Sequence, residues 1–294
     1  MTYNKILAGD IGGSHISVAS FKKSGQATEL IEIKRIPVDS KESKDNILAS
    51  WNRLFKELAG SDNEILLGLA MPAPFDYENG ICWIKDQGKF LNLYGLDLKR
   101  EISESNPIKK DNIKFVNDAE AFLLGESTYG EGKGCEKLMG ITLGSGLGTS
   151  FKIYDSFKDA ALWSAPFKEG IAEDYLGTAW FVNWAKTNMN IKISGVKELT
   201  KDLKIIDKSR PAFREFSSNL ADFISIYDQK YDFDKIILGG NITKASFLFY
   251  KDLLEALKKN GCQKPVCISK LGEKSAFYGV LASIMETKKT SFQH

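Results

Sequence analysis

One short stretch, residues 113–126, most strongly constrains what this chain can fold into. A β-rich run over 113–116 ends abruptly at Asn117 and Asp118. Apolar residues then recur at the spacing of a helix, at Ala121, Phe122 and Leu124. Strand, polar corner and helix in this order place an amide and a carboxylate at the carboxyl end of a strand, where open α/β sheets usually bind ligands. The pattern predicts an α/β fold with a candidate site at Asp118.

Asn117 and Asp118 also have a plainer interpretation. An Asp or Asn at the start of a helix is usually a cap, because its side-chain oxygen satisfies a backbone N–H of the first turn. Capping therefore stays open as an explanation for either residue. Three glycine-rich turns elsewhere in the chain favour a functional site over a cap alone.

The first glycine turn is Asp10-Ile-Gly12-Gly13-Ser14, between an apolar run and a stretch of strand periodicity. Adjacent glycines let the backbone approach an anion closely, and successive N–H groups can line a phosphate. A bare hairpin turn is the alternative for such a motif on its own. No Gly-Lys-Ser follows it, so the turn is not a Walker loop.

Two further glycine turns follow predicted strands. A strand over 137–143 leads into Gly144-Ser145-Gly146-Leu147-Gly148-Thr149, and a strand over 231–238 leads into Gly239-Gly240-Asn241. The second turn resembles the first in kind, since both join two strands. One such hairpin near the start of each half suggests a duplicated nucleotide-binding unit.

Composition excludes several classes of protein. The chain has 294 residues, enough for two domains, and a formal charge of +2 that shows no polybasic footprint for nucleic acid. No segment approaches the roughly 20 apolar residues that span a bilayer, and Asp10 stops the first apolar run too early for a secretory signal. We expect a cytoplasmic protein that binds neither membrane nor nucleic acid.

Histidine and cysteine usage restricts the chemistry further. The two histidines are His15 and the terminal His294, which nearly excludes a His-based hydrolase or a zinc site with several imidazoles. The four cysteines contain no C-x-x-C pair and indicate reduced thiols. Any catalysis must then depend on carboxylates, lysines or backbone dipoles.

Hydrophobic periodicity predicts the remaining elements. Residues 76–95 are expected to form a long loop with short hairpin pieces, and loops of that length are often functional. The tail after Glu286 shows no pattern. Helices are expected over 44–58, 97–104, 176–188, 214–228, 245–258 and 274–285, and further strands over 30–38, 64–71 and 266–269.

The chain resembles the ROK family of sugar kinases and repressors, within the actin-like and hexokinase-like ATPases. The resemblance rests on four motifs in this order: D-I-G-G-S, N-D-A-E-A, L-G-S-G-L-G-T and I-I-L-G-G-N. The resemblance extends from Ile6 to about Met285. It implies two ribonuclease-H-like α/β lobes with ATP and sugar in the cleft between them. The lobes would be a small one over 1–122 and a larger one over 123–273, with a helix at about 274–286 packing back on the first.

The resemblance also implies residue roles. Asp118 would be the general base, Asn117 would bind a neighbouring sugar hydroxyl, and Asp10 would help to hold Mg²⁺ through water. The ATP-binding residues would be those of the three turns, Gly12, Gly13 and Ser14, then Gly144, Ser145, Gly146, Gly148 and Thr149, then Gly239, Gly240 and Asn241.

The sequence departs from the family between Trp163 and Tyr175. Typical members carry a Glu-x-Gly-His sugar contact followed by a cysteine-rich zinc loop that ends in G-C-x-E. Here residues 170–173 resemble only that ending, with Ile171 in place of a cysteine and no histidine nearby. We therefore expect no structural zinc, with Glu173 as a sugar contact and Glu169 as a candidate for the lost one. A solvated residue at a helix start is the alternative for Glu169.

The resemblance implies ATP-dependent phosphorylation of a hexose or amino sugar, with glucose as the default substrate, and a homodimer. The altered sugar tract could change the substrate, because a site that hydrogen-bonds particular hydroxyls rejects analogues that leave its polar groups unpaired. A sugar-sensing regulator or a non-catalytic binding protein of the same family is the alternative.

Overall fold

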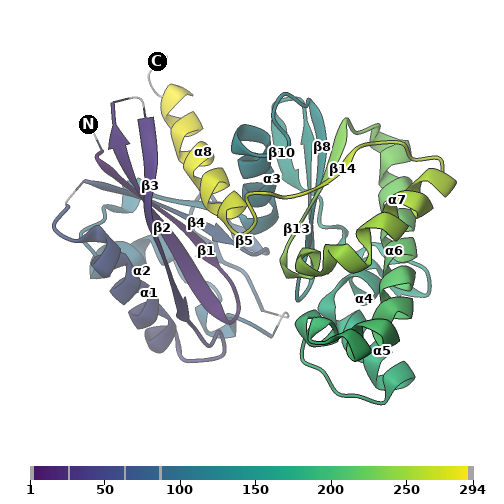
Figure 1. Ribbon diagram of the computed structural model, residues 1–294. Coiled ribbons are helices and arrows are strands. Elements are labelled where there is room, and N and C mark those ends of the chain that lie inside the picture. The colour runs from purple at the N-terminus through teal and green to yellow at the C-terminus, as the bar shows by residue number, and fades with distance from the viewer. Residues whose placement is uncertain (1–2, 26, 63, 86–87, 291–294) are drawn as a thin grey trace. The chain divides into compact units, whose positions relative to one another are not determined.

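The structure is a computed structural model that describes residues 3–25, 27–62, 64–85 and 88–290. By its internal contacts the chain divides into two compact units, Met1–Thr128 with Lys274–His294, and Tyr129–Glu273. Figure 1 shows the elements of both units. The division falls after the expected position 122 because helix α3 (Asp118–Tyr129) continues to Tyr129.

The first unit is built on a five-stranded mixed sheet in the order β3-β2-β1-β4-β7. Strand β2 pairs antiparallel with β1 and β3, while β4 runs parallel to β1 and β7. The bounds are β1 Lys5–Ile11, β2 His15–Ser24, β3 Ala27–Pro37, β4 Ile65–Met71 and β7 Ile113–Asn117. The predicted strand over 64–71 is confirmed, and all seven residues of β4 are buried because helices cover both faces of the sheet.

Helices α1 (Lys44–Ala59) and α8 (Lys274–Thr290) each contribute to one of two separate apolar clusters of this sheet. One cluster holds the α1 residues Trp51 and Phe55, and the other holds Phe277 and Val280 of α8. The unit also contains the short elements β5 Phe75–Asp76, β6 Ile81–Cys82, η1 Leu91–Leu93, α2 Leu98–Ser105 and η2 Lys110–Asn112. The β5–β6 hairpin is one of the short pieces expected within the long loop.

Helices α3 and α8 approach each other through two glycines. A Cβ at Gly125 would lie 2.0 Å from the Ser275 carbonyl oxygen, and one at Gly279 would lie 1.7 Å from the Ala121 carbonyl oxygen. The buried Ser275 hydroxyl donates to Glu126 Oε1 at 2.5 Å beside this contact. Only glycine permits so close a backbone contact, so the helix that begins at Asp118 is fixed against α8.

The second unit repeats the sheet of the first. Its order is β10-β9-β8-β13-β14, with β9 antiparallel to β8 and β10, and β13 parallel to β8 and β14. Its strands are β8 Lys137–Leu143, β9 Leu147–Ile153, β10 Ser156–Asp159, β11 Pro166–Phe167, β12 Gly170–Ile171, β13 Lys235–Gly239 and β14 Val266–Ile268. Its helices are η3 Leu162–Ser164, α4 Ala172–Leu176, α5 Thr178–Met189, η4 Val196–Thr200, α6 Leu203–Tyr231, η5 Asn241–Leu248 and α7 Tyr250–Lys259.

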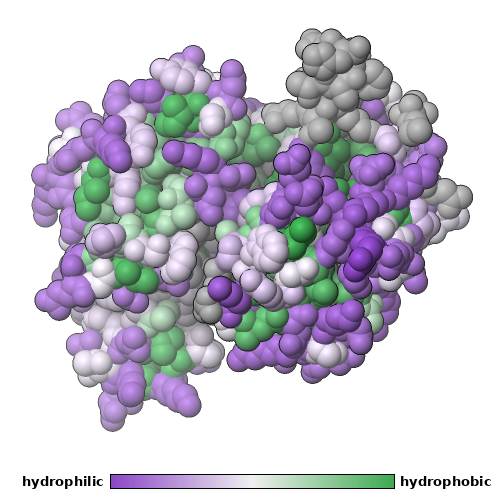
Figure 2. Space-filling view, turned by 180° about the vertical axis from the view of Figure 1, so that it is seen from behind, coloured by the Kyte–Doolittle hydropathy of each residue, from purple (hydrophilic) through white to green (hydrophobic). Residues whose placement is uncertain are grey.

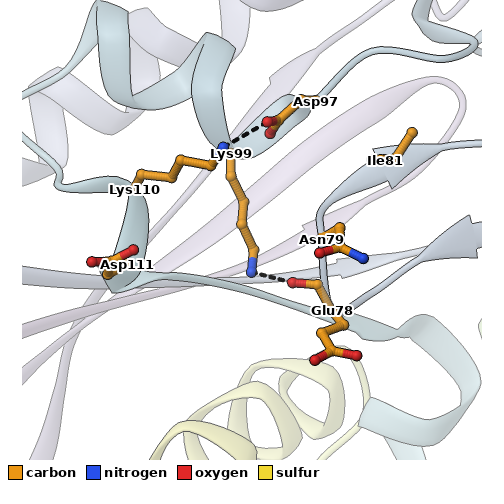
Figure 3. A pocket seen from close by; sticks show the side chains of 7 residues that line it. All are labelled: Glu78, Asn79, Ile81, Asp97, Lys99, Lys110 and Asp111. Atoms are coloured by element: carbon orange, nitrogen blue, oxygen red, sulfur yellow. Dashed lines mark hydrogen bonds and ion pairs between the residues drawn. The ribbon is translucent and has the colours of Figure 1, made fainter.

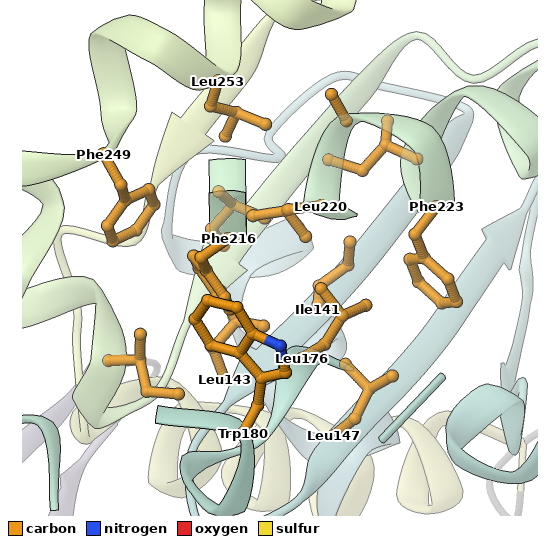
Figure 4. Packing of buried hydrophobic residues seen from close by; sticks show 14 of the residues in the cluster. Ile141, Leu143, Leu147, Leu176, Trp180, Phe216, Leu220, Phe223, Phe249 and Leu253 are labelled. Atoms are coloured by element: carbon orange, nitrogen blue, oxygen red, sulfur yellow. The ribbon is translucent and has the colours of Figure 1, made fainter. Parts of the chain in front are cut away.

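The core of the second unit forms where α6 lies against the sheet. Figure 4 shows Phe216, Leu220 and Phe223 of α6 pointing toward Ile141 and Leu143 of β8. Trp180 of α5 and Leu176 of α4 join the same cluster. This packing positions the β8–β9 turn, which contains the second glycine motif.

Several element predictions were wrong at their ends. The strand predicted over 231–238 begins only at Lys235, because Tyr231 is the last residue of α6. Helix α6 begins at Leu203 rather than at 214, because Asp202 caps it and tertiary packing keeps Pro211 inside the helix. The predicted helix over 245–258 is instead the 3₁₀ segment η5 followed by α7, and the 3₁₀ turns begin directly after Gly240. Helix α8 extends to Thr290, into the tail that shows no sequence pattern, while 291–294 lie outside the described residues.

In the described part of the chain, no helix is both long and apolar enough to span a membrane. Figure 2 shows mostly hydrophilic residues on the face that it displays, with apolar residues in small separate groups.

Candidate active site

Asn117, not Asp118, caps helix α3. Asn117 is the last residue of β7, and its Oδ1 accepts hydrogen bonds from the N–H groups of Ala119 at 2.9 Å and Glu120 at 3.0 Å. These are the bonds that define an N-cap side chain. The capping explanation therefore applies to Asn117. Asp118 Oδ1 shares one of the two donors, because it also accepts from the Ala119 N–H at 2.8 Å.

Tyr77, which the sequence analysis missed, fixes the other end of the Asn117 side chain. Asn117 Nδ2 donates to the Tyr77 hydroxyl at 3.0 Å, and that hydroxyl donates to the Met71 carbonyl oxygen at 3.0 Å. Asn117 is only 2% exposed. In this conformation both ends of its amide are engaged within the protein, so Asn117 positions the start of α3.

Asp118 differs from Asn117 in both exposure and electrostatics. Its side chain is exposed, yet the pKa of its carboxyl is raised because surrounding protein atoms remove part of the water around the carboxylate. The positive charge of Lys89 and the N–H of Ala119 oppose this shift. A solvent-accessible carboxylate with a raised pKa suits proton abstraction near neutral pH.

The first glycine turn lies at the same edge of the same sheet as Asp118. Gly12 follows β1, Asp118 follows β7, and β4 lies between these parallel strands. Two inter-strand spacings place the ends of β1 and β7 about 10 Å apart. Asp10, on β1, pairs with Ser17 just before the turn. The sheet thus brings together the candidate base, the candidate phosphate turn and the candidate magnesium carboxylate.

The fold itself does not require glycine at Gly12, Gly13 or Gly144. None of the three has a positive φ, and a Cβ at any of them would lie no closer than 3.4 Å to another residue. A side chain is therefore absent where the protein has room for one. These three positions leave open space in which a phosphate could approach the turns. The N–H groups of Gly12 and Gly144 already donate within their turns, to the carbonyl oxygens of His15 and Gly146, both at 3.0 Å. Donors to a phosphate would therefore be N–H groups of the neighbouring turn residues.

Gly146 is different, because Glu173 fills the space beside it. A Cβ at Gly146 would lie 2.3 Å from Glu173 Oε2, and the same oxygen accepts a hydrogen bond from the Leu147 N–H at 2.8 Å. Thr178 holds the start of the turn, since its hydroxyl donates to the Gly144 carbonyl oxygen at 2.7 Å. Glu173 of α4, the predicted sugar contact, thus packs against the second glycine turn and hydrogen-bonds to it.

The third glycine turn adjoins the second. Gly239 at the end of β13 pairs with Thr142, and Gly240 has φ 86° with a Cβ position only 2.3 Å from the Leu143 carbonyl oxygen. Gly240 is therefore required by the fold. Asn241 is exposed and accepts a hydrogen bond from Lys244 Nζ at 2.7 Å.

Three predicted site residues lie outside the tips of these turns. They are Gly148, Thr149 and Glu169. Gly148 pairs with Thr142 inside β9, and the hydroxyl of the buried Thr149 accepts a hydrogen bond from the Leu162 N–H at 3.0 Å. Glu169 is exposed in the β11–β12 hairpin, and its N–H donates to the Tyr175 hydroxyl. The structure gives Thr149 a packing role in addition to the predicted one.

A polar recess of about 320 Å³ in the first unit is separate from these residues (Figure 3). Both of its lysines are engaged with the protein, because Lys110 Nζ pairs with Asp97 at 2.6 Å and Lys99 Nζ donates to the Glu78 carbonyl oxygen at 2.5 Å. None of the candidate residues lines it. We do not assign a function to this recess.

The donor set near the first turn fits Mg²⁺ bound with a phosphate ligand. Magnesium usually keeps several waters and binds through one or two carboxylates plus substrate phosphates. Asp10 supplies one carboxylate beside a turn with open space. Among the described residues, no group of three or more His, Cys, Asp or Glu side chains is placed to bind a metal ion.

Comparison with known proteins identifies the relatives of this chain. The model of the ROK family matches residues 6–157. The glucokinase of Thermotoga maritima is 26% identical over 146 residues, which are 49% of this chain and 43% of that protein. The aligned segment thus spans less than half of the length of this curated relative.

Solved structures share the fold over almost the whole chain. A ROK family glucokinase from Streptomyces griseus, solved in complex with glucose and AMPPNP, has a TM-score of 0.73 at 18% identity and covers 94% of this chain and 97% of its own. A ROK family transcriptional regulator, a homolog of the E. coli MLC protein, has a TM-score of 0.72 at 14% identity, with coverages of 95% and 78%. The α/β architecture predicted from the sequence is confirmed as the actin-like ATPase fold of ROK sugar kinases. Since the family model matches more than half of its length, this chain belongs to the ROK family.

Proposed function

We propose that this protein is an ATP-dependent sugar kinase that phosphorylates a hydroxyl of a hexose or amino sugar, with glucose as the first candidate. The observation that carries the proposal is the position of Asp118. It is an exposed carboxylate with a raised pKa at the carboxyl end of β7, on the same sheet edge as the open Gly12–Ser14 turn. Membership of the ROK family and the Streptomyces griseus complex with glucose and AMPPNP support it.

In the proposed reaction, the sugar hydroxyl oxygen attacks the γ-phosphorus of ATP. The new P–O bond forms as the bond from phosphorus to the bridging oxygen breaks, and ADP leaves with that electron pair. Asp118 accepts the hydroxyl proton and later releases it to water. Phosphoryl transfer asks the protein mainly to position the groups in line and to neutralise charge. Asn117 and Tyr77 serve this positioning by fixing the start of α3.

The glycine turns hold the nucleotide in this proposal. The N–H groups of Gly13, Ser14, Ser145 and Gly146 bind phosphate oxygens, since those of Gly12 and Gly144 donate within their own turns. Gly239–Asn241 lies against the adenosine. Asp10 would hold Mg²⁺, and the ion would shield the negative charge of the triphosphate. Glu173 and the exposed Glu169 are the proposed contacts to sugar hydroxyls.

The test is release of ADP from Mg-ATP with glucose, mannose, fructose, N-acetylglucosamine and N-acetylmannosamine, against a blank without sugar. A response above the blank with one of these sugars is the expected result. ATP binding without ADP release from any sugar would contradict the proposal and favour a non-catalytic sensor. A ROK transcriptional regulator shares the fold of this chain, so the assay distinguishes a kinase from a sensor.

A second measurement separates two roles of Glu173. Replacing Glu173 with alanine removes the acceptor of the Leu147 N–H, so the second turn should loosen and Mg-AMPPNP should bind roughly tenfold more weakly. Glu173→Gln is the matched control, because its amide oxygen can still accept that bond. Isothermal titration calorimetry measures both. Unchanged nucleotide affinity together with a raised sugar KM would restrict Glu173 to the sugar.

A further inference from the structure

Lys89 lies directly over the first glycine turn. A Cβ at Gly13 would lie 3.6 Å from Lys89 Cδ and 3.8 Å from Lys89 Cβ. The ammonium group is two bonds beyond Cδ, so it can reach an anion bound at this turn. Lys89 lies in the long loop between β6 and η1, which the sequence analysis marked only as a loop that could be functional.

The backbone fixes this position. The Ser40 N–H donates to the Gly13 carbonyl oxygen at 3.2 Å, and the Phe90 N–H donates to the Ser40 carbonyl oxygen at 2.8 Å. Phe90 is fully buried, and its ring packs edge-on against Trp51 with centroids 5.9 Å apart. The residue next to Lys89 is therefore anchored in the core and tied through Ser40 to the turn.

Lys89 is also near enough to Asp118 for its charge to matter. The cation favours the ionised carboxylate and so opposes the rise in the pKa of Asp118 that loss of solvent causes. One lysine thus lies beside the candidate phosphate turn and acts electrostatically on the candidate base. All of these residues belong to the first unit.

We propose that Lys89 is a further catalytic residue, whose ammonium binds the γ-phosphoryl group of ATP while it is transferred. The inference rests on the proposed kinase function and adds a protein cation to the turn. Negative charge is spread over the equatorial oxygens of the phosphoryl group in the transition state, and a fixed positive charge there lowers the barrier. Lysine acts on phosphate as a point charge. No proton or electron is transferred to it.

The experiment compares Lys89→Met and Lys89→Arg with the wild type, with Lys85→Met as the matched control in the same loop. Calorimetry measures binding of Mg-AMPPNP, which has a γ-phosphoryl group, and of Mg-ADP, which has none. We expect Lys89→Met to bind Mg-AMPPNP about tenfold more weakly, with unchanged affinity for Mg-ADP. Lys89→Arg should recover most of the loss, and Lys85→Met should match the wild type.

Turnover provides a second measurement. With the sugar that the wild type accepts, Lys89→Met should lower kcat by about 100-fold and leave the sugar KM unchanged. Equal weakening of both nucleotides, or no effect on either nucleotide and on kcat, would overturn the role of Lys89 alone. A wild-type protein that binds neither nucleotide would overturn the kinase proposal and this inference with it.

Discussion

Replacing Asp118 with asparagine should lower kcat by about 1,000-fold while nucleotide binding is retained. Asparagine has nearly the same shape as aspartate but cannot accept the hydroxyl proton, and general-base catalysis typically contributes about 10² to 10⁴ in rate. Asn117 keeps its cap and its bond to Tyr77, and the amide oxygen of the new asparagine can still accept the Ala119 N–H, so the start of α3 should be preserved. Steady-state kinetics with the accepted sugar measures kcat, and calorimetry with Mg-AMPPNP measures binding.

The pH profile gives an independent readout of the same group. Asp118 must be ionised to accept a proton, so wild-type kcat/KM should fall as the pH drops through its pKa. That pKa is raised, so the acid limb should lie above the ordinary aspartate value of about 3.9. The residual activity of Asp118→Asn should lack this limb. An acid limb that persists in the variant would assign it to another group.

Stability should change in the opposite direction from activity. Because the folded pKa of Asp118 lies above its unfolded value, the folded state favours the protonated form. That contribution to stability is complete below the unfolded pKa and is lost as the pH rises through the folded pKa. Asparagine cannot ionise and avoids the loss, so Asp118→Asn should raise the Tm at pH 7 and raise it less near pH 4. A lower Tm at pH 7 would contradict the raised pKa.

The sequence predicts the candidate positions at 113–126 from local rules. Strand, polar corner and helix at 113–126 are a matter of periodicity, and the structure has β7 and α3 at that place. The same sheet order in both units agrees with the duplication suggested by the two glycine hairpins. Local sequence could not tell which of Asn117 and Asp118 caps the helix, since both residue types do so.

What the sequence missed depends on contacts between distant segments. Tyr77 bonds Asn117 from 40 residues away. Lys89 lies beside Gly13 because Ser40 hydrogen-bonds both to Gly13 and to Phe90, the residue after Lys89. Helix α6 includes Pro211, which by local rules should end a helix, because its buried stripe packs across the sheet. In each case packing outweighs the local preference, and a single sequence carries no signal for it.

The largest expected effect on stability follows from the contact between α3 and α8. A methyl group at Gly279 would lie 1.7 Å from the Ala121 carbonyl oxygen and 2.5 Å from its carbonyl carbon. Both atoms are backbone and cannot turn aside, so the helices must separate. Separation would open the cluster around Phe277, Val280 and Ile284. We expect Gly279→Ala to lower the free energy of unfolding by about 3 kcal/mol and the Tm by about 10 °C.

Gly195→Ala is the control for replacing glycine as such. A Cβ at Gly195 meets no atom within 4 Å and its φ is −174°, so its Tm should change by no more than about 2 °C. Differential scanning calorimetry measures both variants. Helix α3 begins at Asp118, so a displacement of α3 should also displace Asp118. Gly279→Ala should therefore have a lower kcat even at temperatures at which the variant is still folded. A Tm equal to that of Gly195→Ala would mean that α3 and α8 do not pack this closely, and the fixed position proposed for Asp118 would need another support.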